Sequence, residues 1–129
     1  MDLVIIVVVL ALIQYIAYGI LVGRARGKYG VSAPATTGDP IFERYYRVHQ
    51  NTLEQLMVFL PAIFIFSQLG NPLIAAGLGA VYLVGRLIYL RGYVADPAQR
   101  GTGFMLSFLP SAIMLIWSAA LAARNLITA

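Results

Sequence analysis

Six polar side chains are concentrated in the eight residues from Arg47 to Glu54, in a chain that is 60% hydrophobic. The stretch reads RVHQNTLE. Arginine guanidinium groups bind carboxylates through paired hydrogen bonds, amide side chains bind amide groups, and a carboxylate binds an ammonium group. The combination suits a small peptide-like ligand with several carboxylates and one amine.

The spacing of these side chains places most of them on one face of a helix. At 100° per residue, Arg47, Asn51 and Glu54 fall within about 60° of one another, which makes a polar stripe. Gln50 lies on the same side of the helix. His49 points roughly the opposite way, so we interpret it as a structural residue.

A second polar stripe follows later in the chain, where three tyrosines and one arginine are spaced by four, three and four residues: Tyr82, Arg86, Tyr89 and Tyr93. This spacing stacks a guanidinium among phenol rings on one helix face. Tyr82 is the deepest of the four and either lines a substrate cleft or packs in the core. Arg26 and Arg100 supply further positive charge from nearby loops.

The amino-acid composition indicates that these residues belong to a membrane protein. Only 11% of the residues are charged, against about 25% in soluble domains, and the mean hydropathy is +0.82. A membrane protein is expected, with residues 1–129 forming a single transmembrane domain.

The net charge and the cysteine count narrow the function classes. There is no cysteine, which excludes disulfides, a cysteine nucleophile and cysteine metal ligands, and we expect no metal site. The net charge of +4 is spread over short loops and helix ends. We therefore interpret it as membrane topology and an anionic ligand, with no nucleic acid partner.

Three Asp-Pro or Asn-Pro pairs mark expected helix starts: Asp39-Pro40, Asn71-Pro72 and Asp96-Pro97. Each pair offers an N-cap side chain followed by a proline, which is tolerated at the first helical position. The apolar N-terminal segment is longer than a signal-peptide core and is interpreted as a retained first span. The fold class predicted is an all-α integral membrane protein, a bundle of four transmembrane helices at about 3–23, 40–69, 72–93 and 98–125.

The distribution of Lys and Arg predicts the orientation in the membrane. Basic residues concentrate in the first and third loops, whereas the SQLGNP segment between the second and third helices has no charge. The positive-inside rule then puts loops one and three in the cytoplasm and both termini on the opposite side. Arg124 is the one basic residue that opposes this arrangement.

The balance of charge within the stripes leaves two interpretations open. In the first, the groups neutralise one another, with Glu54 paired to Arg47 or Arg86. In the second, the surplus of arginine over Glu43 and Glu54 is neutralised by an anionic ligand, because each charge at membrane depth costs roughly 2.5 to 3.5 kcal/mol. The count of arginines favours the second.

These residues resemble a known family, the MAPEG proteins (membrane-associated proteins in eicosanoid and glutathione metabolism). FERYYRVHQNTLE is similar to the family's second-helix signature, whose core is RxxxNxxE, and is especially similar to its type 3 microsomal glutathione transferases. TTG at 36–38, VGRLIY at 84–89 and Gly92-Tyr93 also match, in the same order and at nearly the same spacing as in its leukotriene C4 synthase branch. The resemblance covers about residues 24–100.

The resemblance implies a homotrimer of four-helix subunits, with glutathione bound between neighbouring subunits near the cytoplasmic face. By position, the glutathione-binding residues would be Arg26, Arg47, Asn51, Glu54, Arg86, Tyr89 and Tyr93, and the polar stripe adds Gln50. Arg100 matches the arginine that is thought to stabilise the thiolate, and Tyr93 is the alternative partner of the thiol. A thiol of pKa about 8.5 is mostly protonated at neutral pH, so a cation beside the sulfur would raise the concentration of the nucleophile.

The leading hypothesis is a glutathione transferase that conjugates the thiolate to hydrophobic electrophiles arriving from the lipid, a detoxification chemistry. Glutathione peroxidase activity toward lipid hydroperoxides is a further reaction of the same site. Gln55 and Gly27 replace a tyrosine and an arginine of the leukotriene C4 synthase pattern, which argues against eicosanoid specificity. The alternative is a non-enzymatic lipid- or glutathione-binding membrane protein. A small multidrug transporter is disfavoured, because the essential glutamate of such carriers lies in the first helix.

Overall fold

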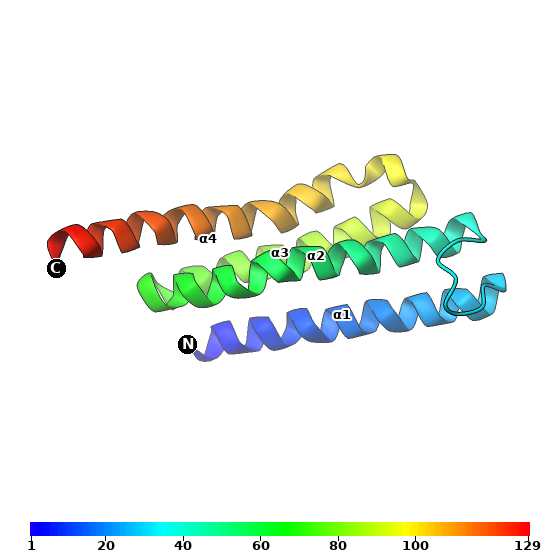
Figure 1. Ribbon diagram of the computed structural model, residues 1–129, viewed down its shortest axis with the longest axis horizontal. Coiled ribbons are helices and arrows are strands. Elements are labelled where there is room, and N and C mark those ends of the chain that lie inside the picture. Colours follow the sequence, from blue (N-terminus) through cyan, green and yellow to red (C-terminus); the bar gives the residue numbers. More distant parts are fainter.

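The computed structural model describes residues 1–129 as four long helices and one 3-10 turn. The helices are α1 (Asp2–Tyr29), α2 (Pro40–Leu69), α3 (Pro72–Ala95) and α4 (Gly101–Thr128), and the turn η1 (Pro97–Gln99) precedes α4. They run side by side along the bundle, with both termini at the same end (Figure 1). Each helix is long and apolar enough to cross a membrane, so the chain is an integral, multi-pass membrane protein.

Two of the helix starts follow directly from the Asp-Pro and Asn-Pro pairs. The Asp39 carboxylate accepts hydrogen bonds from the backbone N–H groups of Ile41 and Phe42, both at 2.9 Å. The Asn71 side chain accepts one from Leu73 at 2.8 Å. These bonds satisfy amide groups that a helix start leaves unpaired.

The third pair, Asp96-Pro97, begins a short 3-10 turn rather than the fourth long helix. Asp96 caps this turn through the N–H of Ala98 at 3.1 Å, and α4 itself begins at Gly101. The expected start at residue 98 is therefore three residues early. The turn brings Arg100 to the junction between η1 and α4.

The first helix continues six residues beyond the expected end at residue 23, through the basic segment RARGKY. It ends at Gly30, which has φ 70° and ψ 34°, a left-handed conformation that glycine adopts without a steric penalty. The N–H of Val31 closes the last turn on the carbonyl of Arg26 at 3.1 Å. The extension places Arg24 and Lys28 on a helix rather than in a loop.

The bundle has one main hydrophobic core between α1, α2 and α3, with contributions from α4. Fully buried members include Val4, Phe59, Phe66 and Met114. Tyr82 is also fully buried and stacks on Phe59 with ring centroids 3.9 Å apart, so it packs in the core. The outward faces carry exposed apolar side chains, as expected for helices in contact with lipid.

Helices α3 and α4 approach each other closely where glycines face the neighbouring backbone. A methyl group added at Gly103 would overlap the backbone of Tyr89. One added at Gly85 would lie 2.7 Å from the carbonyl carbon of Leu106. Small residues of this kind let two membrane helices touch through their backbones.

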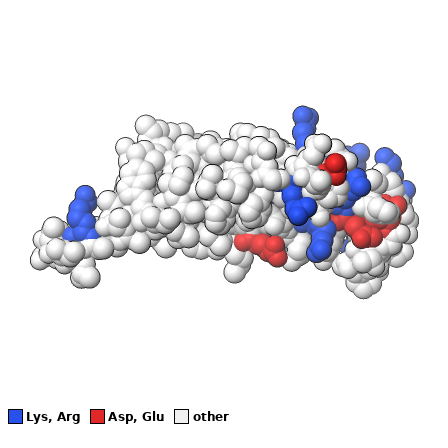
Figure 2. Space-filling model, turned by 90° about the horizontal axis from the view of Figure 1, so that it is seen from above, with Lys and Arg blue, Asp and Glu red and all other residues white.

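Charged side chains gather at the end of the bundle that holds the α1–α2 loop and the α3–α4 turn (Figure 2). The rest of the face in this view is almost free of charge. This end also carries the first half of α2, which contains the polar stripe.

Candidate functional site

Seven side chains of the two polar stripes and the third loop surround one open cavity of about 350 Å³. They are Arg47, Gln50, Asn51, Glu54, Tyr89, Tyr93 and Arg100. The first four come from α2, the tyrosines from α3, and Arg100 from the residue before α4. All seven were candidate site residues in the sequence, and the fold brings them together around this space.

Arg86 lies beneath this cavity rather than in its wall, and it is completely buried. Its Nη2 donates hydrogen bonds to Oδ1 of Asn51 and Oγ1 of Thr52, both at 2.9 Å. Its guanidinium carbon lies 4.3 Å from the centroid of the Tyr89 ring, a cation–π contact. Arg86 therefore holds Asn51 and Tyr89, two residues of the cavity wall, in position.

The hydrogen-bond partners of Arg86 argue against the first interpretation of the charge balance, in which Glu54 is paired to an arginine. The hydrogen bonds of Arg86 go to a neutral amide and a hydroxyl, and Glu54 instead accepts a long hydrogen bond of 3.5 Å from Nδ2 of Asn51. Glu54 is exposed to the cavity. Its carboxylate is thus available to a ligand.

Arg100 is exposed at the cavity rim, and its position is set by the turn before α4. Its Nη1 donates a hydrogen bond to the carbonyl of Pro97 at 2.9 Å. The rings of Tyr89 and Tyr93, which share the cavity with Arg100, have centroids 5.6 Å apart. A guanidinium and two phenols therefore face the same space.

Arg26 is the one predicted site residue that the fold places elsewhere in the subunit. Its Nη1 donates to the carbonyl of Ala35 at 2.7 Å, and its guanidinium lies 4.8 Å from the Phe42 ring centroid. Phe42 packs with Val22, Ala25 and other residues between α1 and α2. Arg26 thus lies beside the first loop and does not contact this cavity.

Two residues with a supporting role were not foreseen from the sequence. Thr52 is buried and binds Arg86 while donating its own hydroxyl hydrogen to the Val48 carbonyl at 2.7 Å. Arg44 donates to the carbonyls of Val94 and Ala95, at 2.9 and 3.3 Å, and so caps the end of α3. Arg44 falls on the same side of the helix as the polar stripe, and Thr52 is one of the six polar side chains from Arg47 to Glu54, but the sequence assigned a role to neither.

His49 lies off the stripe, as expected. Its ring stacks on Tyr15 of α1 with centroids 4.4 Å apart, and it approaches Gly19 closely. His49 therefore joins α2 to α1. No three His, Cys, Asp or Glu side chains lie close enough together to hold a metal ion.

The cavity combines cationic, amide, carboxylate and phenol groups within one small volume. Arg47 and Arg100 suit carboxylates or a thiolate, Gln50 and Asn51 suit peptide groups, and Glu54 suits an ammonium. The fold and the cavity together define a class of protein: a four-helix membrane protein with a polar cavity at one end of its bundle.

Comparison with known proteins identifies the family. Residues 4–120 match the MAPEG family, and the chain belongs to it. The match extends beyond residues 24–100, where the motifs of the sequence indicated it.

Several relatives are similar over much of the chain. An uncharacterised protein of Synechocystis is 50% identical over 107 residues, which cover 83% of this chain and 78% of the relative. Human microsomal glutathione S-transferase 2 is 39% identical over 99 residues, covering 77% of this chain and 67% of that protein. Bovine leukotriene C4 synthase is 41% identical over 76 residues, covering 59% of this chain and 51% of the synthase.

Proposed function

We propose that this protein is a membrane-bound glutathione transferase that conjugates glutathione to hydrophobic electrophiles. The observation that carries the proposal is the cavity between α2, α3 and the start of α4, because its side chains match the groups of glutathione. Glutathione has two carboxylates, two peptide groups, one ammonium and one thiol. Membership of the MAPEG family and the similarity to a protein named microsomal glutathione S-transferase 2 support the same proposal.

Each side chain of the cavity has a role that its chemistry suits. Arg47 binds a carboxylate of glutathione, Gln50 and Asn51 bind peptide groups, and Glu54 binds the ammonium. Arg86 positions Asn51 and the Tyr89 ring from below. Tyr93 and Arg100 are the groups left for the thiol.

The reaction needs the thiol to lose its proton before attack. A thiol with a pKa of about 8.5 is only a few per cent ionised at pH 7, and a guanidinium beside the sulfur favours the thiolate. The proton passes to solvent, the sulfur electron pair forms a bond to the electrophilic carbon, and the leaving group departs with the electrons of the broken bond. Arg100 is assigned this stabilising role, and Tyr93 is the competing candidate.

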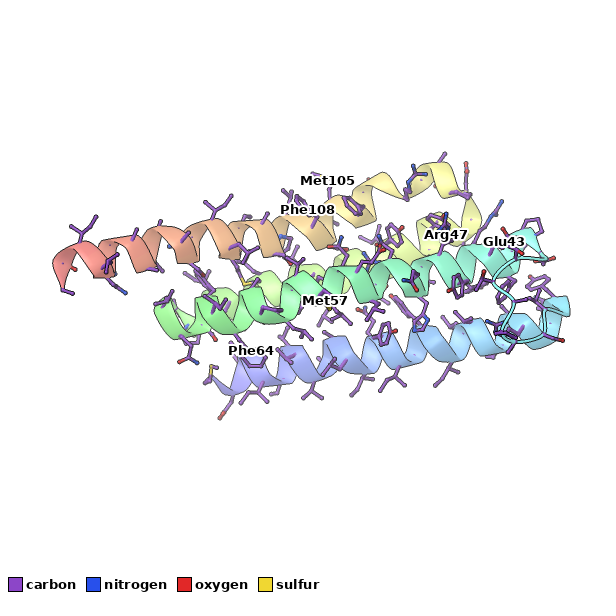
Figure 3. The ribbon with its side chains drawn as sticks, viewed as in Figure 1. Glu43, Arg47, Met57, Phe64, Met105 and Phe108 are labelled. Carbon is purple, nitrogen blue, oxygen red and sulfur yellow. The ribbon has the colours of Figure 1, made fainter.

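An exposed apolar face beside the cavity suits the hydrophobic partner. Met57 and Phe64 on α2 and Met105 and Phe108 on α4 are 72%, 43%, 45% and 43% exposed. Figure 3 shows Glu43 and Arg47 at one end of α2 and Met57 and Phe64 farther along it, with Met105 and Phe108 on the adjacent α4. A lipid-soluble electrophile or lipid hydroperoxide would reach the thiolate along Met105 and Phe108 of α4. With a hydroperoxide, glutathione would act as the reductant in a peroxidase reaction.

The same helix face supports a homotrimer. Along α2, partly or fully exposed residues recur at alternating steps of four and three: Glu43, Arg47, Gln50, Glu54, Met57, Pro61, Phe64 and Gln68. This is the spacing with which helices of neighbouring chains pack together. Arg26, which lies outside the cavity of its own subunit, would complete the site of a neighbour.

The orientation completes the proposal. Loops one and three face the cytoplasm and both termini lie on the opposite side, because the basic residues gather at the end of the bundle with these loops. The glutathione site would then open toward the cytoplasm.

The first test is conjugation of glutathione to 1-chloro-2,4-dinitrobenzene by the detergent-purified protein, with glutathione binding measured by calorimetry. Arg100→Ala is expected to lower kcat roughly 100-fold, the cost of losing one group that stabilises developing charge, and to change glutathione affinity much less. Tyr93→Phe separates the two candidates for the thiol, and thiolate absorbance reports ionisation directly. Arg124→Ala, at the far end of α4, is the control and should leave both quantities unchanged.

Other outcomes are equally informative. Equal loss of binding and turnover in Arg100→Ala would contradict its thiolate role. Binding without turnover or thiolate absorbance in the wild type would favour the non-enzymatic lipid- or glutathione-binding protein instead.

A second test addresses the shared site. Arg26→Ala and Arg47→Ala chains, each inactive alone, are co-expressed and purified as mixed oligomers through two different tags. If each site takes Arg26 from one subunit and Arg47 from its neighbour, every mixed trimer has both residues intact at one of its three interfaces, so about a third of the wild-type activity is restored. Mixed oligomers without activity would show that one subunit supplies both residues.

A further inference from the structure

A second cavity lies between α1 and α2 and shares no residue with the glutathione site. It has a volume of about 240 Å³ and is lined by Leu21, Arg24, Ala25, Lys28, Tyr29 and Tyr45. Its wall contains two cations and two phenols, and no acidic residue. The proposed transferase reaction uses none of these side chains.

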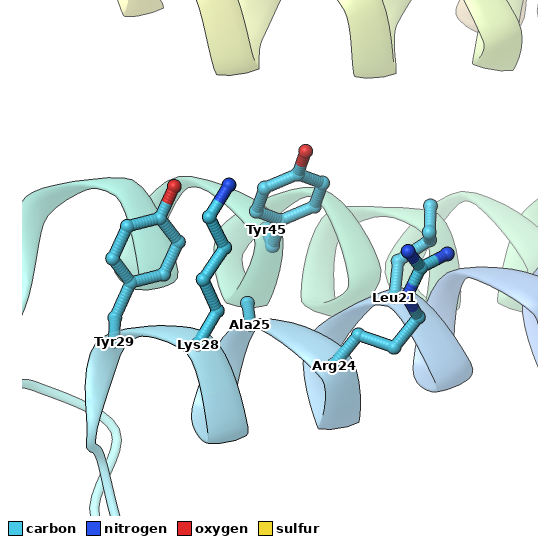
Figure 4. Close-up of a pocket in the computed structure, with 6 residues that line it drawn as sticks. All are labelled: Leu21, Arg24, Ala25, Lys28, Tyr29 and Tyr45. Atoms are coloured by element: carbon cyan, nitrogen blue, oxygen red, sulfur yellow. The ribbon is translucent and has the colours of Figure 1, made fainter.

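The two cations of this cavity act from one side of one helix. Arg24 and Lys28 are a single turn apart on α1; Lys28 extends alongside the Tyr29 ring, whereas Arg24 extends along the helix toward Leu21 (Figure 4). The Lys28 ammonium lies 5.4 Å from the centroid of the Tyr29 ring. Two positive charges with phenol donors beside them and no carboxylate in the wall form a site for a phosphate-sized anion.

An apolar groove continues from this cationic cavity toward α3. A cavity of about 320 Å³ is lined by Leu21, Tyr45, Leu90, Arg91, Val94 and Ala95, and Leu21 and Tyr45 belong to both. One end of the combined surface is therefore cationic, and the other is lined mainly by aliphatic side chains. A ligand that fills both parts has an anionic head and an apolar chain.

The position of the cavity along α1 indicates that such a ligand comes from the lipid of the membrane. Ile16 and Ile20, one to two turns before Arg24, are 61% and 60% exposed and belong to the apolar face of the span. Tyrosines and basic residues at the end of a span lie at the level of lipid headgroups.

We infer that this surface is a binding site for an anionic phospholipid. The phosphate lies between Arg24 and Lys28, and an acyl chain runs along Leu21, Leu90 and Val94. The inference does not rest on the transferase reaction, because no cavity residue is common to the two sites.

The experiment measures thermal unfolding of the full chain in mixed micelles that contain phosphatidylglycerol or phosphatidylcholine with identical acyl chains. Trp117, the only tryptophan, lies on α4 with its ring 5.0 Å from that of Phe66 and reports loss of packing far from the lipid site. We expect phosphatidylglycerol to raise the unfolding temperature more than phosphatidylcholine, with a saturable concentration dependence. Arg24→Gln and Lys28→Gln should each weaken the apparent affinity about fivefold, the contribution of one basic residue near an anionic membrane surface.

Two matched variants keep the test decisive. Arg124→Gln removes one exposed cation at the opposite end of the bundle and should retain the full response. Lys28→Arg keeps the charge and should also retain it. Because Arg24 and Lys28 are exposed, the variants should unfold at the wild-type temperature in phosphatidylcholine.

Four results would overturn the inference. The first is an equal response of the wild type to both lipids, and the second is loss of the response in Arg124→Gln. The third is an equal stabilisation by inorganic phosphate without lipid, which would show a site for a soluble anion. A response that appears only when the oligomer dissociates or associates would assign the surface to a second copy of the chain.

Discussion

Arg86 and the pair Arg47 and Arg100 are the same residue type at one end of one bundle, yet their surroundings differ in every respect. Arg86 is completely buried and bound by Asn51, Thr52 and the face of Tyr89. Arg47 and Arg100 are exposed in an open cavity. The difference separates an arginine that positions its neighbours from arginines that are accessible to a ligand.

The physical basis of this separation is the cost of burying a charge. A buried guanidinium persists only when hydrogen bonds or other favourable contacts replace water. Arg86 receives such contacts from neutral groups at Nη2 and from the Tyr89 ring, while its Nε and Nη1 have no hydrogen-bond partner, and it leaves Glu54 free. Exposed guanidinium groups have no such requirement: Arg100 uses only Nη1, on the carbonyl of Pro97, and its other donors can bind an anion.

Substitution of the buried Arg86 should have the largest effect on stability. Arg86→Ala leaves a cavity in a packed layer and removes a donor from Asn51 and Thr52, so the free energy of unfolding should fall by about 2–5 kcal/mol. Arg47→Ala should leave the unfolding temperature unchanged while weakening glutathione binding. Unfolding followed by Trp117 fluorescence and binding followed by calorimetry distinguish the two. Equal destabilisation by both variants would show that burial does not separate their roles.

Removing the carboxylate of Glu54 should change ligand affinity without changing stability. Glu54→Gln should weaken glutathione binding roughly tenfold, because a charge-assisted bond to the ammonium becomes a neutral one. Its thermal stability should not change, since Glu54 is exposed. The matched control is Glu43→Gln on the same helix, whose carboxylate accepts a hydrogen bond from the N–H of Gly38 at 3.2 Å and lies outside the cavity. Equal weakening of glutathione binding in both variants would show that the overall charge of the surface, rather than the Glu54 carboxylate itself, determines the affinity.

The smallest expected effect concerns the hydroxyl that supports Arg86. Thr52→Val preserves the shape of the side chain and removes one acceptor of Arg86, which should cost about 1 kcal/mol of unfolding free energy. Thr52→Ser should recover most of this loss, and Thr102→Val, at an exposed position on α4, should be neutral. If Thr52→Val has no effect, Asn51 and Tyr89 alone hold the guanidinium.

The sequence predicted the helices best where both ends carried a chemical signal. The second helix has Asp39 and Pro40 at its start and Gly70 after its end, and its observed bounds coincide with those expected. The end of α1 was placed too early because hydropathy locates the lipid boundary, and a helix continues into water until a residue such as Gly30 stops it. The start of α4 was misplaced because Asp96-Pro97 suits a 3-10 turn as well as a long helix.

The candidate site could be predicted where helical periodicity collects charged and aromatic side chains on one face. That periodicity placed Arg47, Asn51 and Glu54 together, and the fold adds Tyr89 and Tyr93 from the second stripe. Helical periodicity gives the face on which a side chain lies but not how deeply it is buried. It therefore could not distinguish the buried Arg86 from the exposed arginines. It also gave no signal for Thr52, whose role arises only when α3 packs on α2.

The glycine contacts between α3 and α4 bear on how the site opens. Because Gly103 lies against the backbone of Tyr89 without a side chain between them, the wall formed by Tyr89, Tyr93 and Arg100 has little freedom to part. In the proposed transferase, ligand entry and product release would therefore depend on movements of the α2 side of the cavity. A rigid wall of this kind would keep Tyr89, Tyr93 and Arg100 in a fixed arrangement, so that movement of the opposite wall would limit the proposed turnover.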